Sequence, residues 1–263
     1  MKKIFLISFI FSAVAFSQTL IPKLPQITAS SFLLIDAETN KIIAQQNPEA
    51  STGLASITKI MTSYIVADYL KQGFLNIKDS TTVSEKCWRM EGSRMFIQEG
   101  KKVLIEDLMR GMIIQSGNDA ACALAEHIAG TQEDFASLMN DYAQKMELKN
   151  TNFTNPTGLP NVNHYSTAED IAKLSIVLIN DFPDEYAIYS EKEFTYNDIR
   201  QLNRNSLLWQ DDSIDGIKTG HTRASGYCLV ASSKRADMRL ISIVLNSASE
   251  KSRLQDKIIG LWF

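Results

Sequence analysis

The sequence predicts an α+β protein, in which one antiparallel sheet is assembled from both chain ends and a helical cluster packs on it. Three observations lead to this fold class. Strand-like segments occur near the amino-terminal end, helical apolar spacing fills the middle, and strand-like segments return near the carboxyl-terminal end. Strands from both ends need burial against the same helices, so we expect them to share one sheet.

The first strands are expected as a hairpin over residues 31–46. Residues 31–35 form one strand, residues 36–40 have turn chemistry, and residues 41–44 return. Three further strands are predicted near the other end, at residues 215–222, 226–232 and 239–245, the last two joined by a polar turn at residues 233–237.

Helical spacing of apolar residues marks the middle of the chain. Two capping devices support it: Thr131 with Asp134, and Ser166 with Glu169, each ahead of an apolar run. Residues 80–103 show no single period. The helices are expected at residues 56–71, from Leu104 to Ile113, after the tripeptide Ser116-Gly117-Asn118 as far as Gly130, and after each capping device.

The start of the chain has the pattern of a secretory signal peptide. Lys2 and Lys3 precede an apolar run over residues 4–16, and Ala15-Phe16-Ser17 offers a cleavage site before Gln18. We therefore expect residues 1–17 to be a signal peptide and residues 18–263 to form the mature domain. The mature protein would then act outside the cytoplasm.

Composition excludes some classes of function. The formal net charge of −3, with no basic stripe, gives no reason to expect a nucleic-acid partner. His127, His164 and His221 are too scattered to indicate a metal site, and no cofactor is expected. An odd count of three cysteines leaves at least one thiol free. Cys122 and Cys228 lie in apolar periodic segments and are interpreted as small buried hydrophobic residues.

The motif Ser56-Ile57-Thr58-Lys59 could carry nucleophilic chemistry. Residues three apart at a helix start share one face. A serine hydroxyl needs a nearby base, and a lysine is a base only when it is neutral. Burial and a second cation, which Lys218 could supply, both lower a lysine pKa. Alone the motif is common by chance, and a serine at a helix start is often only a cap.

Two more tripeptides follow in order. Ser116 could relay a proton to a leaving amine, and Asn118 could hold a substrate amide or the Lys59 ammonium. The alternative is an ordinary helix break. On the predicted strand, Lys218-Thr219-Gly220 could bind a carboxylate while the strand pairs with an extended peptide. The alternative there is a solvated strand.

All three motifs resemble those of the low-molecular-mass penicillin-binding proteins that act as D-Ala-D-Ala carboxypeptidases, the S11 serine peptidases. The resemblance is to the penicillin-binding protein 5/6 type and spans roughly residues 25–260. It implies a β-lactamase/transpeptidase-like fold. It rests on the stretches ASITKIMTSY, SGNDA, FTYNDIRQLNRN, DGIKTGHT and MRLIS.

The resemblance implies a role for each site residue. Ser56 would be the acylated nucleophile and Lys59 its general base, with the backbone N–H groups of Ser56 and His221 as the oxyanion hole. Arg204 matches a family arginine near the substrate carboxylate, and Arg253 matches a second; a structural ion pair is the alternative for both. The remaining roles are proton transfer and substrate placement by Ser116 and Asn118, and carboxylate binding by Lys218 and Thr219.

The resemblance also implies a substrate and a location. A periplasmic enzyme of this type removes the terminal D-alanine from a peptidoglycan stem peptide ending in D-Ala-D-Ala, and β-lactams inhibit it covalently. Such proteins usually carry a second, β-rich domain and an amphipathic membrane anchor. This chain stops at Phe263, where that domain would begin. We therefore expect the catalytic domain without them, and leave contact with the inner membrane open.

An endopeptidase that acts on peptidoglycan cross-links stays open as a close relative of this interpretation, and two alternatives of other classes remain. A class A-like β-lactamase needs a glutamate for deacylation, typically in Glu-x-x-Leu-Asn. Residues 193–197 copy that spacing with tyrosine in place of leucine, but they alternate as a strand does, so we interpret Glu193 as a decoy. A non-catalytic cell-wall binding protein is the other alternative, and the full set of catalytic side chains argues against it.

Overall fold

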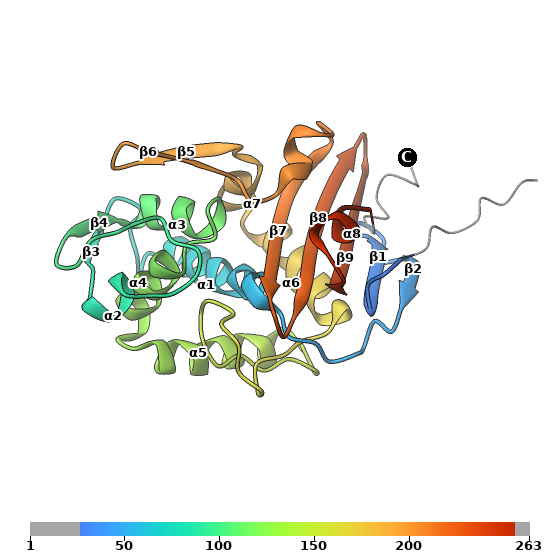
Figure 1. Ribbon diagram of the computed structural model, residues 1–263, viewed down its shortest axis with the longest axis horizontal. Helices are drawn as coiled ribbons and strands as arrows, with labels where there is room; N and C mark the ends of the chain where they lie inside the picture. Colours follow the sequence, from blue (N-terminus) through green and yellow to red (C-terminus); the bar gives the residue numbers. More distant parts are fainter. Residues whose placement is uncertain (1–26, 256–263) are drawn as a thin grey trace, which may run out of the picture.

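A computed structural model describes residues 27–255, and the predicted signal peptide lies outside them. A five-stranded antiparallel sheet has the order β2-β1-β9-β8-β7, so strands from both chain ends meet where β1 pairs with β9. The predicted fold class is confirmed (Figure 1). The strands are β1 Ser31–Asp36, β2 Ile42–Gln46, β7 Ile214–Thr222, β8 Gly226–Arg235 and β9 Met238–Ser247.

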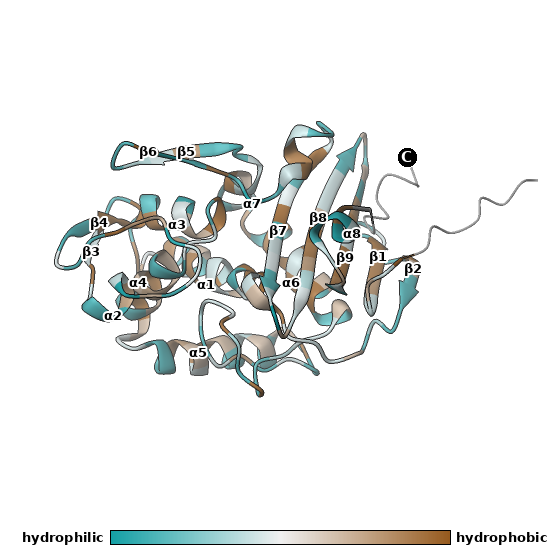
Figure 2. Ribbon diagram, in the orientation of Figure 1, coloured by the Kyte–Doolittle hydropathy of each residue, from teal (hydrophilic) through white to brown (hydrophobic). Residues whose placement is uncertain are grey.

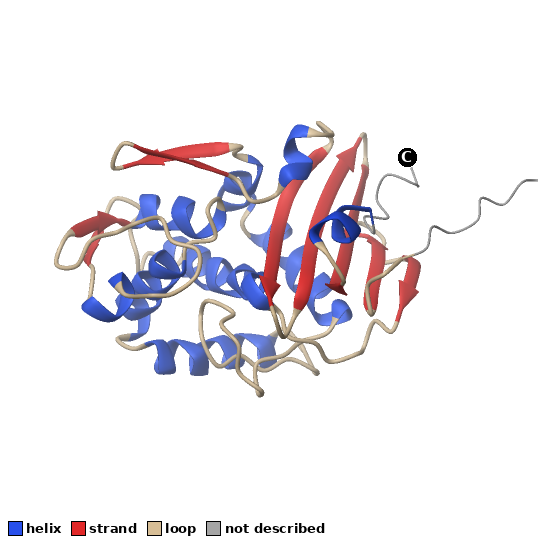
Figure 3. Ribbon diagram, viewed as in Figure 1, coloured by secondary structure: helices blue, strands red, loops and turns tan. Residues whose placement is uncertain are grey.

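The helical cluster lies beside β7, and the sheet closes the other side of the molecule (Figure 3). Two small antiparallel sheets border the cluster: β3 Ser80–Thr82 with β4 Lys102–Leu104, and the hairpin of β5 Glu193–Tyr196 with β6 Ile199–Leu202. The helices are α1 Lys59–Lys71, α2 Glu85–Trp88, α3 Ile105–Ile113, α4 Asn118–Ala129, α5 Gln132–Lys145, α6 Ala168–Asp181, α7 Pro183–Tyr186 and α8 Glu250–Gln255, with 3-10 turns η1 Ala55–Thr58, η2 Ala187–Ser190 and η3 Ser206–Trp209.

Both faces of the sheet are covered, which explains why its strands are apolar on both sides. Leu33 and Ile243 belong to the large core cluster shared with the helices, whereas Leu34 and Val244 belong to a second, smaller cluster. Successive side chains of a strand point to opposite faces. Contacts place α6 against β1 and β9, and α8 against β8 and β9. The edge strand β2 ends in two glutamines, and Figure 2 shows that end in teal.

Helix α1 forms the centre of the molecule. Nine of its residues, from Lys59 to Ala67, are buried. Burial of each large apolar side chain contributes roughly 1.5–3 kcal/mol, so the helix is fixed firmly in place. Its predicted start was wrong: residues 55–58 form the 3-10 turn η1, and the α-helix begins at Lys59. Within residues 27–255, no helix has the length and apolar character that crossing a bilayer requires.

One predicted cap is confirmed and the other is displaced by one residue. Thr131 Oγ1 accepts the N–H of Asp134 at the start of α5. At α6 the cap is Thr167, whose Oγ1 accepts the N–H of Asp170. Ser166 lies in an isolated bridge with Thr52 and stays outside the helix, so the prediction of Ser166 as the cap was wrong.

The interpretation of Cys122 was also wrong. Cys122 on α4 is buried, but it forms a disulfide with Cys87 on α2, 35 residues earlier. Cys228 is the buried free thiol, as expected. Strand β8 continues to Arg235, beyond the predicted end at residue 232, because Ser232 and Ser233 are buried inside the sheet and pair with β9.

Candidate active site

Ser56 and Lys59 lie together where η1 passes into α1. Residues three apart in a 3-10 turn are eclipsed, so their side chains leave the turn in the same direction. Lys59 Nζ lies 3.0 Å from Ser56 Oγ. Burial of α1 holds the lysine in place, since the Lys59 side chain is 1% exposed.

Lys59 has two further partners, and both are oxygens that can only accept. Its Nζ donates to Asn118 Oδ1 and to the Thr157 carbonyl, each at 2.7 Å. A neutral amine has two N–H groups and one lone pair. Because the two carbonyl oxygens use both N–H groups, the lone pair is left for the hydroxyl proton of Ser56. This geometry would direct the lone pair of a neutral Lys59 amine toward Ser56 Oγ.

Electrostatics favour that neutral form. Burial lowers the pKa of Lys59 well below its ordinary value, the positive charge of Lys218 lowers it further, and Asp119 opposes the shift. Lys218 is also fully buried, and burial together with Arg204 and Arg253 lowers its own pKa to about 7. Two lysines in a dry site cannot both keep their charges easily.

Ser116 presents a free hydroxyl to the site. It lies between α3 and α4, with φ of +66°, a left-handed conformation that is costly for serine. Its Oγ is buried and has no hydrogen-bond partner among the described residues. Strain and an orphaned hydroxyl commonly coincide at functional sites. Ser116 is thus available for proton exchange with a bound ligand.

A cavity of about 380 Å³ joins these groups. Ser56 and Ser116 face it from the helical side, and Thr219 and His221 face it from β7. Lys59 and Asn118 are buried behind Ser56, and Lys218 is buried near Lys59, so the structure brings the predicted site residues together. The cavity is lined by Ser56, Ser93, Ser116, Arg204, Thr219, Gly220, His221, Tyr227, Glu250 and Arg253.

Two arginines make the cavity electropositive. Arg204 lines it and forms no ion pair with any residue in the described part of the chain. Arg253 pairs with Glu250 at 2.9 Å, yet its Nε is buried without a partner. The structural ion pair considered for Arg253 therefore exists, but it leaves a donor unused. An anionic ligand would satisfy both guanidinium groups.

Strand β7 passes close to Ser56 because residue 220 is glycine. A Cβ at Gly220 would lie 3.0 Å from the Leu54 carbonyl oxygen and 3.1 Å from the Ser56 nitrogen. β7 is also an edge of the sheet, with β8 on one side only. An extended peptide can therefore pair with its other edge, directly in front of Ser56.

Two residues of the site were missed by sequence reasoning. The buried carboxylate of Asp119 accepts the N–H groups of Met95, Phe96 and Ile97, which fixes the cavity rim. An acidic residue in the first turn of a helix was the available signal, but it indicates only a favourable dipole contact. Thr157 acts through its backbone carbonyl, and no side-chain pattern reveals that.

Glu193 lies outside the cavity. It is on β5, where it forms an ion pair with Arg200 across the hairpin. It is not among the residues that line the cavity containing Ser56. The interpretation of this glutamate as a decoy for a deacylating base agrees with its position.

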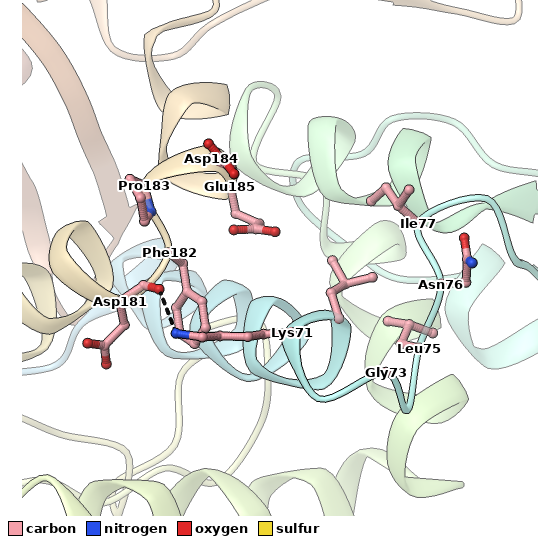
Figure 4. Close-up of a pocket in the computed structure, with 11 residues that line it drawn as sticks. Lys71, Gly73, Leu75, Asn76, Ile77, Asp181, Phe182, Pro183, Asp184 and Glu185 are labelled. Carbon is pink, nitrogen blue, oxygen red and sulfur yellow. Dashed lines mark hydrogen bonds between the residues drawn. The ribbon is translucent and has the colours of Figure 1, made fainter.

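A larger cavity, of about 630 Å³, lies at the other end of α1 (Figure 4). Lys71 Nζ donates to the Asp181 carbonyl there, beside the ring of Phe182. Because α1 has 13 residues, this cavity is roughly 20 Å from Ser56. Its lining contains no serine, threonine or cysteine. Among residues 27–255, the one close group of potential metal ligands is Cys87, Cys122 and Glu126, and both sulfurs are in the disulfide.

Comparison with known proteins agrees with this geometry. Residues 18–249 match the family of D-alanyl-D-alanine carboxypeptidases, peptidase family S11. The chain belongs to the S11 D-alanyl-D-alanine carboxypeptidase family. Among S11 relatives, it is 45% identical over 255 residues to DacC of Escherichia coli K12, covering 94% of this chain and 64% of DacC. It is 46% identical to DacA of Haemophilus influenzae, covering 90% and 62%.

A solved S11 structure confirms the β-lactamase/transpeptidase-like fold. Penicillin-binding protein 5 of Haemophilus influenzae superposes with a TM-score of 0.88 at 46% identity, covering 91% of this chain and 71% of that one. The chain spans about three fifths of the length of the curated S11 relatives it matches.

Proposed function

We propose that this protein is a serine D-Ala-D-Ala carboxypeptidase, which removes the terminal D-alanine from peptidoglycan stem peptides. The observation that carries the proposal is the Lys59 amine, 3.0 Å from Ser56 Oγ, with both its N–H groups engaged by acceptor-only oxygens. The family supplies the substrate class. The predicted signal peptide favours a periplasmic location, where such peptides occur.

Binding uses β7 and the two arginines. The peptide pairs antiparallel with the open edge of β7, so its terminal carboxylate lies toward Thr219 and Arg204. Arg253 offers its unused Nε to the same anion. The cavity requires no cofactor for this arrangement, because its own cations neutralise the carboxylate.

Acylation follows from proton transfer between helix neighbours. Neutral Lys59 takes the proton of Ser56 while Oγ attacks the carbonyl of the penultimate D-alanine. The backbone N–H groups of Ser56 and His221 stabilise the oxyanion; loss of one such donor typically costs about 3 to 4 kcal/mol. The departing amine receives its proton through Ser116, whose hydroxyl has no competing partner. Water then hydrolyses the ester and regenerates Ser56.

The experiment is release of D-alanine from a diacylated tripeptide ending in D-Ala-D-Ala. We expect the purified protein to release D-alanine and Ser56→Ala to release none, with both giving the same circular dichroism spectrum. Equal release by the two proteins would refute the assignment.

β-Lactams give a second readout that separates the carboxypeptidase from a β-lactamase. Glu193 is not among the residues that line the cavity and is paired with Arg200, and Glu250, the glutamate in the lining, is paired with Arg253, so no unpaired glutamate is offered for fast deacylation. Penicillin should therefore leave a long-lived adduct on Ser56, visible as one mass increment in intact-protein mass spectrometry. Rapid turnover with no adduct would favour the lactamase.

A further inference from the structure

The loop between α5 and α6 supplies one of the two carbonyl oxygens that engage the Lys59 amine. We call residues 154–164 the carbonyl loop. Three hydrogen bonds of 2.7 Å dock it onto η1 and α1: Lys59 Nζ donates to the Thr157 carbonyl, Thr62 Oγ1 donates to the Pro156 carbonyl, and Thr58 Oγ1 bonds His164 Nε2. The middle of the loop therefore contacts Lys59, and its last residue contacts Thr58.

The hydrogen bonds of His164 define its tautomer. Its Nδ1 accepts the backbone N–H of Thr154 at 3.0 Å, and a backbone N–H can only donate. The neutral ring therefore carries its proton on Nε2, and Nε2–H donates to Thr58 Oγ1. The His164 side chain is buried edge-on against the ring of Phe153, and Thr58 is buried as well. The bond between His164 and Thr58 is thus shielded from water and has a fixed direction.

The carbonyl loop packs directly on η1, with no side chain between the two backbones at Gly158. A Cβ at Gly158 would lie 1.7 Å from the Ala55 carbonyl oxygen and 2.8 Å from Thr58 Oγ1. Inside the loop, Asn155 Oδ1 accepts the N–H groups of Thr157 and Gly158. Because Asn155 ties these residues together, a shift of the loop at Thr58 is passed on to the Thr157 carbonyl.

The proposed base needs that carbonyl in place. A neutral Lys59 amine directs its lone pair at Ser56 when both of its N–H groups are engaged, and the Thr157 carbonyl engages one of them. His164 bonds the residue directly before Lys59, yet it does not line the cavity that contains Ser56. Burial, with the charge of Lys59 adding to it, lowers the pKa of His164 to about 4, so the ring stays neutral near pH 7 and keeps this bond.

We propose that His164 is a positioning residue for the base: through Thr58 it holds the carbonyl loop on η1, and so it keeps the Thr157 carbonyl on the Lys59 amine. This proposal rests on the proposed function, in which neutral Lys59 takes the proton of Ser56. The bond that acts is the one from Nε2–H to Thr58 Oγ1. A side chain at position 164 that restores this bond should therefore restore the rate.

The test is stopped-flow acylation by penicillin, which separates the dissociation constant of the non-covalent complex from the acylation rate constant. His164→Leu keeps much of the side-chain volume but cannot donate. Because a displacement of about 1 Å can cost a reaction roughly a hundredfold, we expect this variant to acylate at least about tenfold more slowly. The dissociation constant should keep its wild-type value, since His164 does not line the cavity. A fold that was merely less stable would lower the fraction of protein that reacts, and the rate constant would stay.

His164→Gln is the rescue variant, because a planar amide offers one donor and one acceptor, as the neutral imidazole does. It should recover most of the acylation rate that His164→Leu loses. His127→Leu, at the exposed histidine on α4, is the matched control and should acylate at the wild-type rate. Recovery in neither variant at position 164, with the same slow rate for both, would contradict the role of the Nε2–H bond.

Thr58→Val removes the acceptor of the same bond and keeps the branched shape. It carries the same expected loss, which keeps the proposal testable if His164→Leu does not fold. If the two residues act through one bond, the Thr58→Val/His164→Leu double variant should be no slower than the slower single variant. Losses that multiply in the double variant, or wild-type rate constants in both single variants, would overturn the positioning role. Failure of penicillin to acylate the wild type would instead contradict the proposed function.

Discussion

At the scale of single residues, the site depends on which of two buried lysines carries the proton. Lys59 is surrounded so that its neutral form is fully hydrogen-bonded, and Lys218 is the neighbouring cation that disfavours its charge. Replacing Lys218 should therefore change the reactivity of Ser56 through the pKa of Lys59.

Lys218→Gln tests this coupling through the pH dependence of acylation. The Lys218 charge lowers the pKa of Lys59, so its loss should raise that pKa and leave less neutral base at a given pH. In the proposed mechanism, the rate of acylation by penicillin rises as Lys59 loses its proton. The rising limb of the pH–rate profile should thus move to higher pH in the variant. A limb at the wild-type position would contradict the coupling.

His164 makes a second residue-scale contribution, this time to stability. Burial lowers its pKa to about 4 from an ordinary value near 6.5. The unfolded chain binds this proton between those values and the folded chain does not, so stability falls as pH decreases from 6.5 to 4. The full loss from this group is about 3 kcal/mol.

His164→Gln removes the titrating group. Urea unfolding at pH 7 and pH 4.5 should show a smaller drop in the free energy of unfolding for the variant than for the wild type. His127→Gln, a histidine on α4, is the matched control and should keep the wild-type drop. Equal drops in wild type and His164→Gln would show that His164 carries no acid sensitivity.

At the scale of elements, the cavity rim is attached to α4 by several bonds. Asn118 donates from Nδ2 to the Glu91 carbonyl, and its own N–H donates to the Ser93 carbonyl. The Cys87–Cys122 disulfide ties the same segment to the same helix covalently. Helix α4, which holds Lys59 through Asn118, is thus fixed to the segment of residues 87–93 that borders the cavity.

Cys87→Ser/Cys122→Ser measures what the clamp contributes. Closing a loop of 35 residues stabilises a fold by about 4 kcal/mol in the chain-entropy description. We expect the double variant to lose stability of that order in chemical denaturation and to acylate more slowly, because Asn118 is held less firmly. Cys228→Ala, at the free thiol, is the control for loss of a buried sulfur. If the double variant keeps the stability and acylation rate of the wild type, the disulfide contributes to neither.

Sequence reasoning identified elements better than their contacts. The Ser56–Lys59 spacing, the order of the three motifs and the strands at both ends were readable because side-chain type and periodicity encode them. The Thr157 and Glu91 carbonyls were not readable, since backbone groups carry no sequence signal. Thr167 rather than Ser166 caps α6 because the bridge to Thr52 decides between two equally suitable residues. The Cys87–Cys122 disulfide could not be predicted because it depends on the packing of α2 against α4, which the sequence pattern does not reveal.

At the scale of the whole molecule, the site is made where two layers meet. The helical cluster supplies Ser56, Lys59 and Ser116, and the sheet supplies Lys218 and Thr219. Neither layer contains a complete reaction centre. The two layers pack closely at Gly220, where a Cβ would lie only 3.0 Å from the carbonyl oxygen of Leu54. The fold-level prediction succeeded for the same reason, because burial demanded that both layers share one core.

The pairing of β1 with β9 joins segments roughly 200 residues apart in the chain. A nascent chain that emerges from its amino-terminal end cannot finish this sheet until nearly all of the domain has been delivered. The serine and its lysine appear early, whereas the strand that completes their surroundings appears late. The surroundings of Ser56 and Lys59 are therefore completed only after the last strands of the sheet have been synthesised.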